Sequence, residues 1–313
     1  MDRRDLRSAR VMSAGRLRSA GEYCMNLVKQ ADFDNYLAGL LVPGEHRGAH
    51  FALRAFNVEL ASMKDQTHGN AIAGRIRFQW WRETIDSIYN GAGATEQQFK
   101  QQPVAYALSH YCRDMGLSRH WLERSLEARQ RDLSQDHHET LDDLETYAEQ
   151  GHSSILYLLL ESMDVRNEQS NYMASHIGVC SGLTTFLRGF PHHVSKRQLY
   201  IPLELLRKNS LTAGQLLSGA ALPVDASRAL QDCVFEVASQ AHGHLELARD
   251  LFADEAKAIP RRAIHICGPA VRSALYLKTL REMNFDPLHP DLQRNSQLAY
   301  QWKLLQMRFR KSL

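Results

Sequence analysis

Two histidine pairs are the first residues of this chain whose types could bind a transition metal. They are His192-His193 and His242-Gly-His244. On a helix, side chains at adjacent positions or two positions apart diverge, whereas metal-binding helices place two ligands four positions apart. We therefore expect no metal site at either pair. We interpret these imidazoles as solvated or core-edge groups that hydrogen-bond to their neighbours.

A group of acidic residues could be read as a second metal site. It consists of Asp142, Asp143, Glu145 and Glu149, and it follows Thr140. A threonine three positions before an acidic residue is typical of a helix start, where carboxylates are favoured by the helix dipole. We expect these acids to cap a helix and to face water.

Two adjacent tryptophans, Trp80 and Trp81, have arginines beside them and could stack on a base or an isoprenoid. Their spacing to Ile76 and Ile85 is that of one helix face. This spacing favours packing of both tryptophans in the core.

The elements that would position these residues are helices. The clearest apolar stripe has spacings of three and four and consists of Leu230, Cys233, Val234, Val237, Ala238, Ala241, Leu245, Ala248 and Leu251. A second stripe runs from Ile177 to Leu187, and the alternating pattern typical of strands is scarce. Capping sequences begin at Thr140 and Thr212, and prolines lie between the stripes. The sequence predicts an all-α fold.

Composition excludes several classes of protein. The 313 residues suit one large helical domain. Lys and Arg total 38 against 35 Asp and Glu, so a formal charge of +3 provides no field that would gather nucleic acid. The five cysteines include no Cys-x-x-Cys pair, which argues against a disulfide framework or a zinc site. We expect no nucleic-acid partner, no metal and no cofactor.

Both ends of the chain are basic. Residues 1–20 contain six arginines, and we expect a flexible segment that is either a matrix-targeting leader or a solvated tail. No apolar run is long enough to cross a bilayer. Near the other end, Trp302, Leu305 and Phe309 fall on one side of a helical pattern with basic residues around them. This pattern is typical either of a helix lying on an anionic membrane or of a final helix packed through Trp302 and Leu305.

Three segments together carry a resemblance to a known family. Residues 51–65 read Phe-Ala-Leu-Arg-Ala-Phe-Asn-Val-Glu-Leu-Ala-Ser-Met-Lys-Asp, residues 183–193 read Leu-Thr-Thr-Phe-Leu-Arg-Gly-Phe-Pro-His-His, and Arg197, Tyr200 and Pro202 form an R-x-x-Y-x-P segment. They resemble the squalene/phytoene synthase family, in which two helices each carry a D-x-x-x-D motif. The resemblance covers the chain from about Tyr23 past Ala248. It implies a single helical domain of the isoprenoid synthase type, which we place at residues 21–313.

The motifs of that family have a physical purpose. Carboxylates four positions apart lie on one helix face, so two facing helices can hold Mg²⁺ against a diphosphate. In this chain Ala61 stands at the first position of the first motif, and only Asp65 keeps the second. Gly189 and His193 stand at both positions of the other motif, where Pro191 would also end the helix. We therefore predict a non-catalytic relative without catalytic residues.

The resemblance further implies a vestigial cavity that keeps cations after losing its metals. We expect its lining to include Arg54, Asp65, Asp132, Arg188, Arg197 and Tyr200. Its arginines could hold an anionic head group or an acidic peptide. The alternative is that each arginine pairs with a local carboxylate such as Asp65 or Glu59. Glu59 cannot replace the lost aspartate, because six positions from Asp65 it points to a different helix face.

Four more segments look closest to one eukaryotic branch, the mitochondrial complex I assembly factors. They are residues 79–82, 153–157, 174–178 and 238–245. The branch implies a role in early complex I assembly at the matrix side of the inner membrane. It implies complex I subunits or other assembly factors as partners, while peripheral contact with the membrane is predicted from the pattern of Trp302, Leu305 and Phe309. The ambiguous leader leaves a cytosolic pool open.

Two other functions stay open. One is a Mg²⁺-dependent prenyltransferase with an altered site on Asp65 and Asp132, which would release pyrophosphate. The other is a peripheral isoprenoid- or lipid-binding protein, whose binding to vesicles would weaken with salt.

Overall fold

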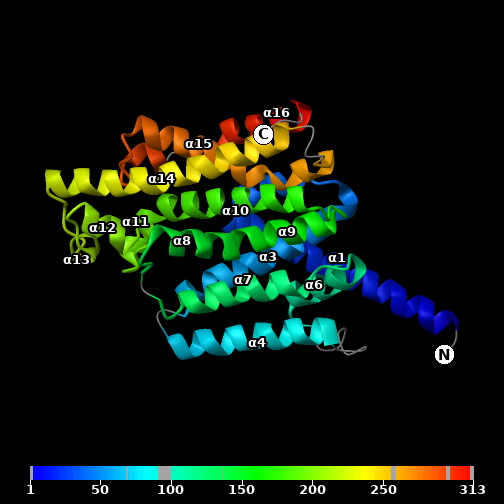
Figure 1. Cartoon of the computed structure of the whole chain (residues 1–313). Helices are drawn as coiled ribbons and strands as arrows, with labels where there is room; N and C mark the ends of the chain where they lie inside the picture. The colour runs from blue at the N-terminus through cyan, green and yellow to red at the C-terminus, as the bar shows by residue number, and fades with distance from the viewer. Residues whose placement is uncertain are drawn as a thin grey trace.

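The computed structural model describes residues 3–67, 70–90, 99, 101–135, 137–254, 259–293 and 297–310. Within these ranges the chain forms helices and loops and no strand, which confirms the predicted all-α fold (Figure 1). The elements in chain order are α1 Arg3–Ala31, α2 Phe33–Leu40, α3 Gly44–Gln66, α4 Ala71–Asn90, α6 Pro103–Asp114, α7 Arg119–Asp132, α8 Leu141–Ala148, η1 Glu149–Ser153, α9 Ser154–Ser162, α10 Glu168–Arg188, α11 Phe190–Ser195, α12 Leu203–Lys208, α13 Ala213–Leu217, α14 Val224–Ala253, η3 Arg261–Ile266, α15 Gly268–Glu282, η4 Pro290–Gln293 and α16 Gln297–Arg310.

The helix starts follow the chemistry of the sequence. At α8 the Thr140 hydroxyl accepts from the Asp143 amide at 3.1 Å, and the Asp143 carboxylate accepts from the Thr140 amide at 3.0 Å. Thr212 and Gln215 form the same reciprocal box at α13. Each box satisfies amides that a helix start would otherwise leave unpaired, and both were predicted.

Helix α10 lies at the centre of the bundle, between α14 on one side and the continuous run of α8, η1 and α9 on the other (Figure 1). Two glycines of α10 allow this close approach. A Cβ added at Gly178 would lie 2.6 Å from the backbone of Ser153, and one at Gly182 would lie 3.0 Å from Ala148 Cα. The helix facing this contact widens into the π-helical turn η1, which carries His152. Such turns are often found at functional sites.

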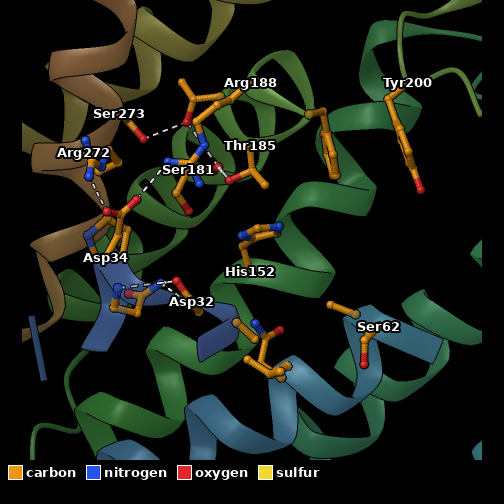
Figure 2. Close-up of a pocket in the computed structure, with 18 of the residues that line it drawn as sticks. Asp32, Asp34, Ser62, His152, Ser181, Thr185, Arg188, Tyr200, Arg272 and Ser273 are labelled. Carbon is orange, nitrogen blue, oxygen red and sulfur yellow. Dashed lines mark hydrogen bonds and ion pairs between the residues drawn. The ribbon is translucent and has the colours of Figure 1, made fainter. Parts of the chain in front are cut away.

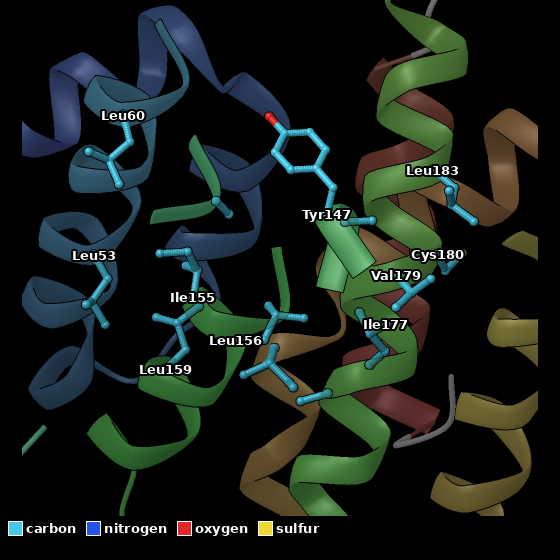
Figure 3. Close-up of a cluster of buried hydrophobic side chains, with 14 of the residues drawn as sticks. Leu53, Leu60, Tyr147, Ile155, Leu156, Leu159, Ile177, Val179, Cys180 and Leu183 are labelled. Carbon is cyan, nitrogen blue, oxygen red and sulfur yellow. The ribbon is translucent and has the colours of Figure 1, made fainter. Parts of the chain in front are cut away.

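Apolar side chains from α3, α9 and α10 interlock in the core. Figure 3 shows Leu53 and Leu60 of α3 on one side of Ile155 and Leu159 of α9, with Leu183 of α10 beyond them. All five are at most 2% exposed. Burial of such side chains contributes about 1.5–3 kcal/mol each, so this core holds together the helices that surround the site.

Of the two adjacent tryptophans, Trp81 lies in the core and Trp80 lies nearer the surface. Trp81 is 1% exposed and its ring meets that of Phe56 edge to face at a centroid distance of 4.8 Å, which confirms its predicted core packing. Trp80 is only partly buried, and Ile76 is 64% exposed. The buried stripe of α4 is therefore narrower than the sequence pattern indicated.

The N-terminal helix differs from the expected flexible segment. Helix α1 is continuous from Arg3 to Ala31, so the predicted division after residue 20 falls inside it. Its first part runs out from the body of the molecule (Figure 1). The role of residues 1–20 as a targeting leader stays a prediction. Among the described helices, none combines the length and the apolar character that a bilayer span requires.

Helix α16 packs through a face other than the expected one. Tyr300, Leu304 and Met307 are its buried residues. Trp302 and Leu305 are 62% and 40% exposed, so the predicted packing through these two residues is wrong. The same helix thus has a core face and a separate exposed apolar face.

Candidate functional site

A cavity of about 360 Å³ lies between α2, α3, α7, α10 and α15, and Figure 2 shows many of its side chains. Its charged lining residues are Asp32, Asp34, Asp65, Asp132, Arg54, Lys64, Arg129, Arg188 and Arg272. Two histidines, His152 and His193, line it as well. The cavity is therefore a polar chamber in which carboxylates and cations are closely mixed.

Five of the six predicted cavity residues do line this chamber: Arg54, Asp65, Asp132, Arg188 and Tyr200. The sixth prediction, Arg197, is wrong. Arg197 is exposed, and its backbone is left-handed with φ of 57° where the chain turns after α11. This turn leaves Arg197 in solvent, while Gln198 and Tyr200 line the cavity.

Asp34 is the centre of the charge network, and sequence reasoning missed it. Arg188 Nη1 donates to Asp34 Oδ2 at 2.9 Å, and Arg272 Nη2 donates to Asp34 Oδ1 (Figure 2). The guanidinium of Arg272 also lies over the Tyr300 ring, 4.4 Å from its centroid. Arg188 was expected to pair, if at all, with Asp65 or Glu59, so its partner is a different carboxylate.

The local sequence gave little sign of this role. Asp32 and Asp34 read as capping acids of a short helix, and Asp32 does cap α2 by accepting from the Asn35 amide at 3.4 Å. Asp34 and Arg272 are 238 positions apart. Only the packing of α15 against α2 brings them together.

On the opposite wall, Asp132 is held by two neighbours. Tyr200 Oη donates to Asp132 Oδ2 at 2.9 Å, and Lys64 Nζ lies 3.4 Å from Asp132 Oδ1. Burial, together with Tyr147 and Asp132 nearby, raises the pKa of Tyr200. The phenol therefore stays protonated and acts as a donor to the carboxylate.

Three of the four positions that the resemblance assigns to the aspartate motifs line the cavity, and Gly189 is not among the lining residues. Ala61, Asp65 and His193 line the cavity, and α10 ends at Arg188 with Gly189 as its cap, as Pro191 predicted. Burial, followed by His192, lowers the pKa of His193 to about 4. A neutral imidazole thus stands at the position where the resemblance places a carboxylate.

Asp65 is partly exposed and lies 3.3 Å from His192 Nε2. Glu59 does not line the cavity among the described residues. Burial raises the pKa of Glu59. This carboxylate lies on another face of α3 and accepts a hydrogen bond from Trp81 of α4. The different directions of Glu59 and Asp65 were predicted from their spacing.

These residues do not fit a Mg²⁺ cluster. Mg²⁺ needs oxygen ligands held in octahedral geometry, whereas Asp34 is bridged by two arginines and Asp132 is bonded to Lys64 and Tyr200. The described part of the chain holds no group of three His, Cys, Asp or Glu side chains that could bind a metal. An altered metal site on Asp65 and Asp132 therefore has no support in the geometry.

The cavity instead presents buried polar atoms that lack hydrogen-bond partners. Within the described residues, Arg54 Nε and Arg129 Nε are buried without a hydrogen-bond partner, as is His152 Nε2. Arg54 is 5% exposed, and burial lowers its pKa. Burial, then Arg129, lowers the pKa of His152 well below its ordinary value, so its ring is neutral. A buried guanidinium with an unsatisfied donor is costly, and an anion in the cavity would relieve that cost.

The second histidine pair lies elsewhere. His244 contacts His176, with 2.7 Å between the two Nδ1 atoms, and its Nε2 lies 3.3 Å from Glu145 Oε2. His242 is exposed. These contacts match the interpretation of core-edge imidazoles bonded to neighbours. Glu145, expected in water, is mostly buried beside His244.

Comparison with known proteins agrees with the fold and with the family resemblance. The model of the family described as squalene/phytoene synthase matches residues 28–301. A Bos taurus protein named NADH dehydrogenase (ubiquinone) complex I, assembly factor 6, is 36% identical over 276 residues, covering 88% of this chain and 78% of that protein. The Homo sapiens protein of the same name is 33% identical over the same shares of the two chains.

A solved structure shows the same fold. Squalene synthase HpnC from Alicyclobacillus acidocaldarius superposes with a TM-score of 0.72 at 17% identity, over 87% of this chain and 97% of that one. At this identity the likeness concerns the fold alone. The family model, by contrast, spans the cavity and both motif positions, and the chain therefore belongs to the squalene/phytoene synthase family.

Proposed function

We propose that this chain is an assembly factor for respiratory complex I that works by binding and carries out no prenyl transfer. The assembly role is supported by its similarity to relatives named as complex I assembly factors over most of its length. The non-catalytic part is supported by one observation above all. Asp34, a carboxylate that lines the cavity, forms ion pairs with Arg188 and Arg272 and is therefore not free to bind a metal.

Catalysis is lost because too few carboxylates remain in the cavity to bind the metals that the reaction needs. Ionisation of a prenyl diphosphate leaves a highly charged leaving group that the family neutralises with metals. Here Ala61, Gly189 and His193 remove three of the four motif carboxylates. The remaining one, Asp65, is half-exposed and faces a histidine. The chain lacks the charge needed to assemble metals beside a diphosphate.

We infer that the protein acts early in assembly, in mitochondria, at the matrix side of the inner membrane. Its partners would be complex I subunits or other assembly factors. Peripheral membrane contact is supported by α16, where Leu298, Trp302 and Phe309 are 79%, 62% and 80% exposed. Aromatic and aliphatic side chains on one face of a helix are suited to the boundary of a bilayer.

The test uses cells from which their own relative of this protein has been deleted and in which native gels show a loss of assembled complex I. Wild-type chain should restore assembled complex I on native gels, and so should Asp65→Asn. Failure of Asp65→Asn at normal protein level would contradict a binding role. In parallel, purified protein with farnesyl diphosphate and Mg²⁺ should release no pyrophosphate. Release that disappears in Asp65→Asn would show a live enzyme.

A second candidate function is binding of a small oxyanion in the cavity without a metal. It rests on the buried, unpartnered Nε of Arg54 and on the neighbouring Arg129. Calorimetry with inorganic pyrophosphate in EDTA should show binding that Arg54→Met removes. Arg197→Met, outside the cavity, is the matched control and should bind like wild type. Absence of binding by wild type would show that the cations serve only the fold.

A further inference from the structure

A second hollow lies on the other side of α15 from the cavity. It is a groove of about 820 Å³ between α14, α15 and α16. Arg272, Ser273 and Tyr276 of α15 face the cavity, whereas Ala274 and Leu277 of the same helix line the groove. The two hollows share no lining residue among those described. The groove therefore has no part in the synthase-like site.

The floor of the groove is apolar. Leu245 of α14, Leu277 of α15 and Met307 of α16 line it and are buried at 2%, 8% and 8% exposure. Small residues, Ala238 and Ala274 among them, leave the space open above that floor. The volume is within the range of about 300–1,000 Å³ that is usual for small-molecule sites.

One aromatic pair forms part of the groove lining. Phe235 of α14 meets Phe285, just after α15, with ring centroids 5.0 Å apart and planes at 81°. Both rings line the groove. Their contact adds aromatic surface to the apolar lining of the groove.

The charges of the groove all have one sign. Its charged lining residues are Arg249, Lys278, Arg281 and Lys303, and no carboxylate lines it in the part of the chain that the structure describes. Arg249 is neutralised by Glu246 at 2.6 Å, and Lys278 has Glu282 at 3.8 Å. Arg281 and Lys303 are exposed. The combination of an apolar floor with exposed cations is complementary to an amphiphile with an anionic head group.

Helix α16 links the groove to the exposed apolar face. Lys303, Gln306 and Met307 line the groove, while Trp302 and Leu305 point to solvent. If that face meets a bilayer, the groove lies beside the head groups and can be filled from the membrane.

We propose that this groove binds one acyl chain of an anionic phospholipid, with the phosphate held by the exposed cations of α15 and α16. The inference rests on the membrane contact of the proposed function. The acyl chain of the lipid would cover the buried side chains of Leu245, Leu277 and Met307. Protein and lipid then share one surface, and the groove selects anionic lipid over zwitterionic lipid.

The test uses the full-length chain and vesicles of phosphatidylcholine with or without phosphatidylglycerol. After incubation and recovery, native mass spectrometry should detect one phosphatidylglycerol per wild-type chain. Ala274→Phe, which fills the groove, should abolish this adduct. Arg281→Gln with Lys303→Gln, at exposed positions that do not endanger folding, should weaken phosphatidylglycerol binding roughly thirtyfold, the effect of two cations. Lys196→Gln with Arg197→Gln, outside the groove, is the control and should retain the adduct.

The outcomes separate the groove from the membrane contact. If the wild-type protein binds no vesicle, the proposed contact with the membrane is wrong. If the protein binds vesicles and the adduct survives in both Ala274→Phe and the Arg281→Gln, Lys303→Gln variant, the groove is not the lipid site. Retention of free oleate but not of phosphatidylglycerol would overturn the choice of a phospholipid. An empty groove that becomes protected from hydrogen exchange only in a complex with a protein would show that a protein segment is the occupant.

Discussion

Arg188 and Asp34 lie 154 positions apart in the sequence, yet Arg188 Nη1 donates to Asp34 Oδ2 at 2.9 Å. Asp34 also accepts from Arg272, so one carboxylate joins α2 to both α10 and α15. Arg188 is the last residue of α10, directly before Gly189, where the resemblance places the start of the second motif. The helix end that would support metal chemistry is thus tied down by an ion pair.

Asp34→Asn should lower the free energy of unfolding by about 2–3 kcal/mol. Removing one partner from a buried ion pair leaves uncompensated charge, and the partial exposure of Arg188 reduces the cost. Urea unfolding measures the change. Asp232→Asn, on the exposed side of α14, is the control and should change stability by less than about 0.5 kcal/mol. Equal effects of the two variants would contradict a central role for Asp34.

Two Gly→Ala variants should have opposite effects. Gly178→Ala places a Cβ 2.6 Å from the Ser153 backbone and should destabilise the protein by about 1–3 kcal/mol. At Gly243 in α14 an added Cβ meets nothing within 4 Å, so Gly243→Ala should stabilise by about 0.5–1 kcal/mol. Thermal unfolding distinguishes them. A neutral Gly178→Ala would mean that α10 and η1 are not closely packed.

Stability should fall as the pH falls from about 6.5 towards 4. Burial, followed by Arg54, lowers the pKa of His50 to about 3, and burial, followed by His244, lowers that of His176 to about 4. In this window the unfolded chain, with imidazole pKa near 6.5, binds protons that the folded chain does not, so acid favours unfolding. His50→Gln should reduce the slope by up to about 1.4 kcal/mol per pH unit.

The pH series is measured by urea unfolding at constant ionic strength. His120→Gln, at an exposed position, is the control and should keep the wild-type slope. If His50→Gln also keeps it, the His50 ring takes up a proton in the folded state.

The two faces of α16 should separate binding from stability. Trp302→Ser with Phe309→Ser should leave stability within about 0.5 kcal/mol, because both side chains are mostly exposed, but should weaken sedimentation with anionic vesicles at least tenfold. Leu304→Ala, at 2% exposure, should cost about 2–5 kcal/mol of stability. Unchanged vesicle binding by the double variant would assign the exposed face to something other than a membrane.

The sequence by itself determined the helical class and many local details. Stripes with spacings of three and four predicted α10 and α14, and the boxes at Thr140 and Thr212 predicted two helix starts. These features are local, because capping and amphipathic periodicity depend on residues within one or two turns. Ala61, Asp65 and His193, at motif positions that the resemblance assigns, line the cavity.

Only the tertiary structure decided which charges meet. No local pattern pointed to Asp34, Arg272 or His152 as cavity residues. The R-x-x-Y-x-P segment pointed to Arg197, but the left-handed turn at this residue places it outside the cavity. The exposed face of α16 was likewise decided by which side packs on α15. Ion pairs between distant segments depend on how helices are packed, and periodicity shows that a helix has an apolar face but not which neighbour covers it.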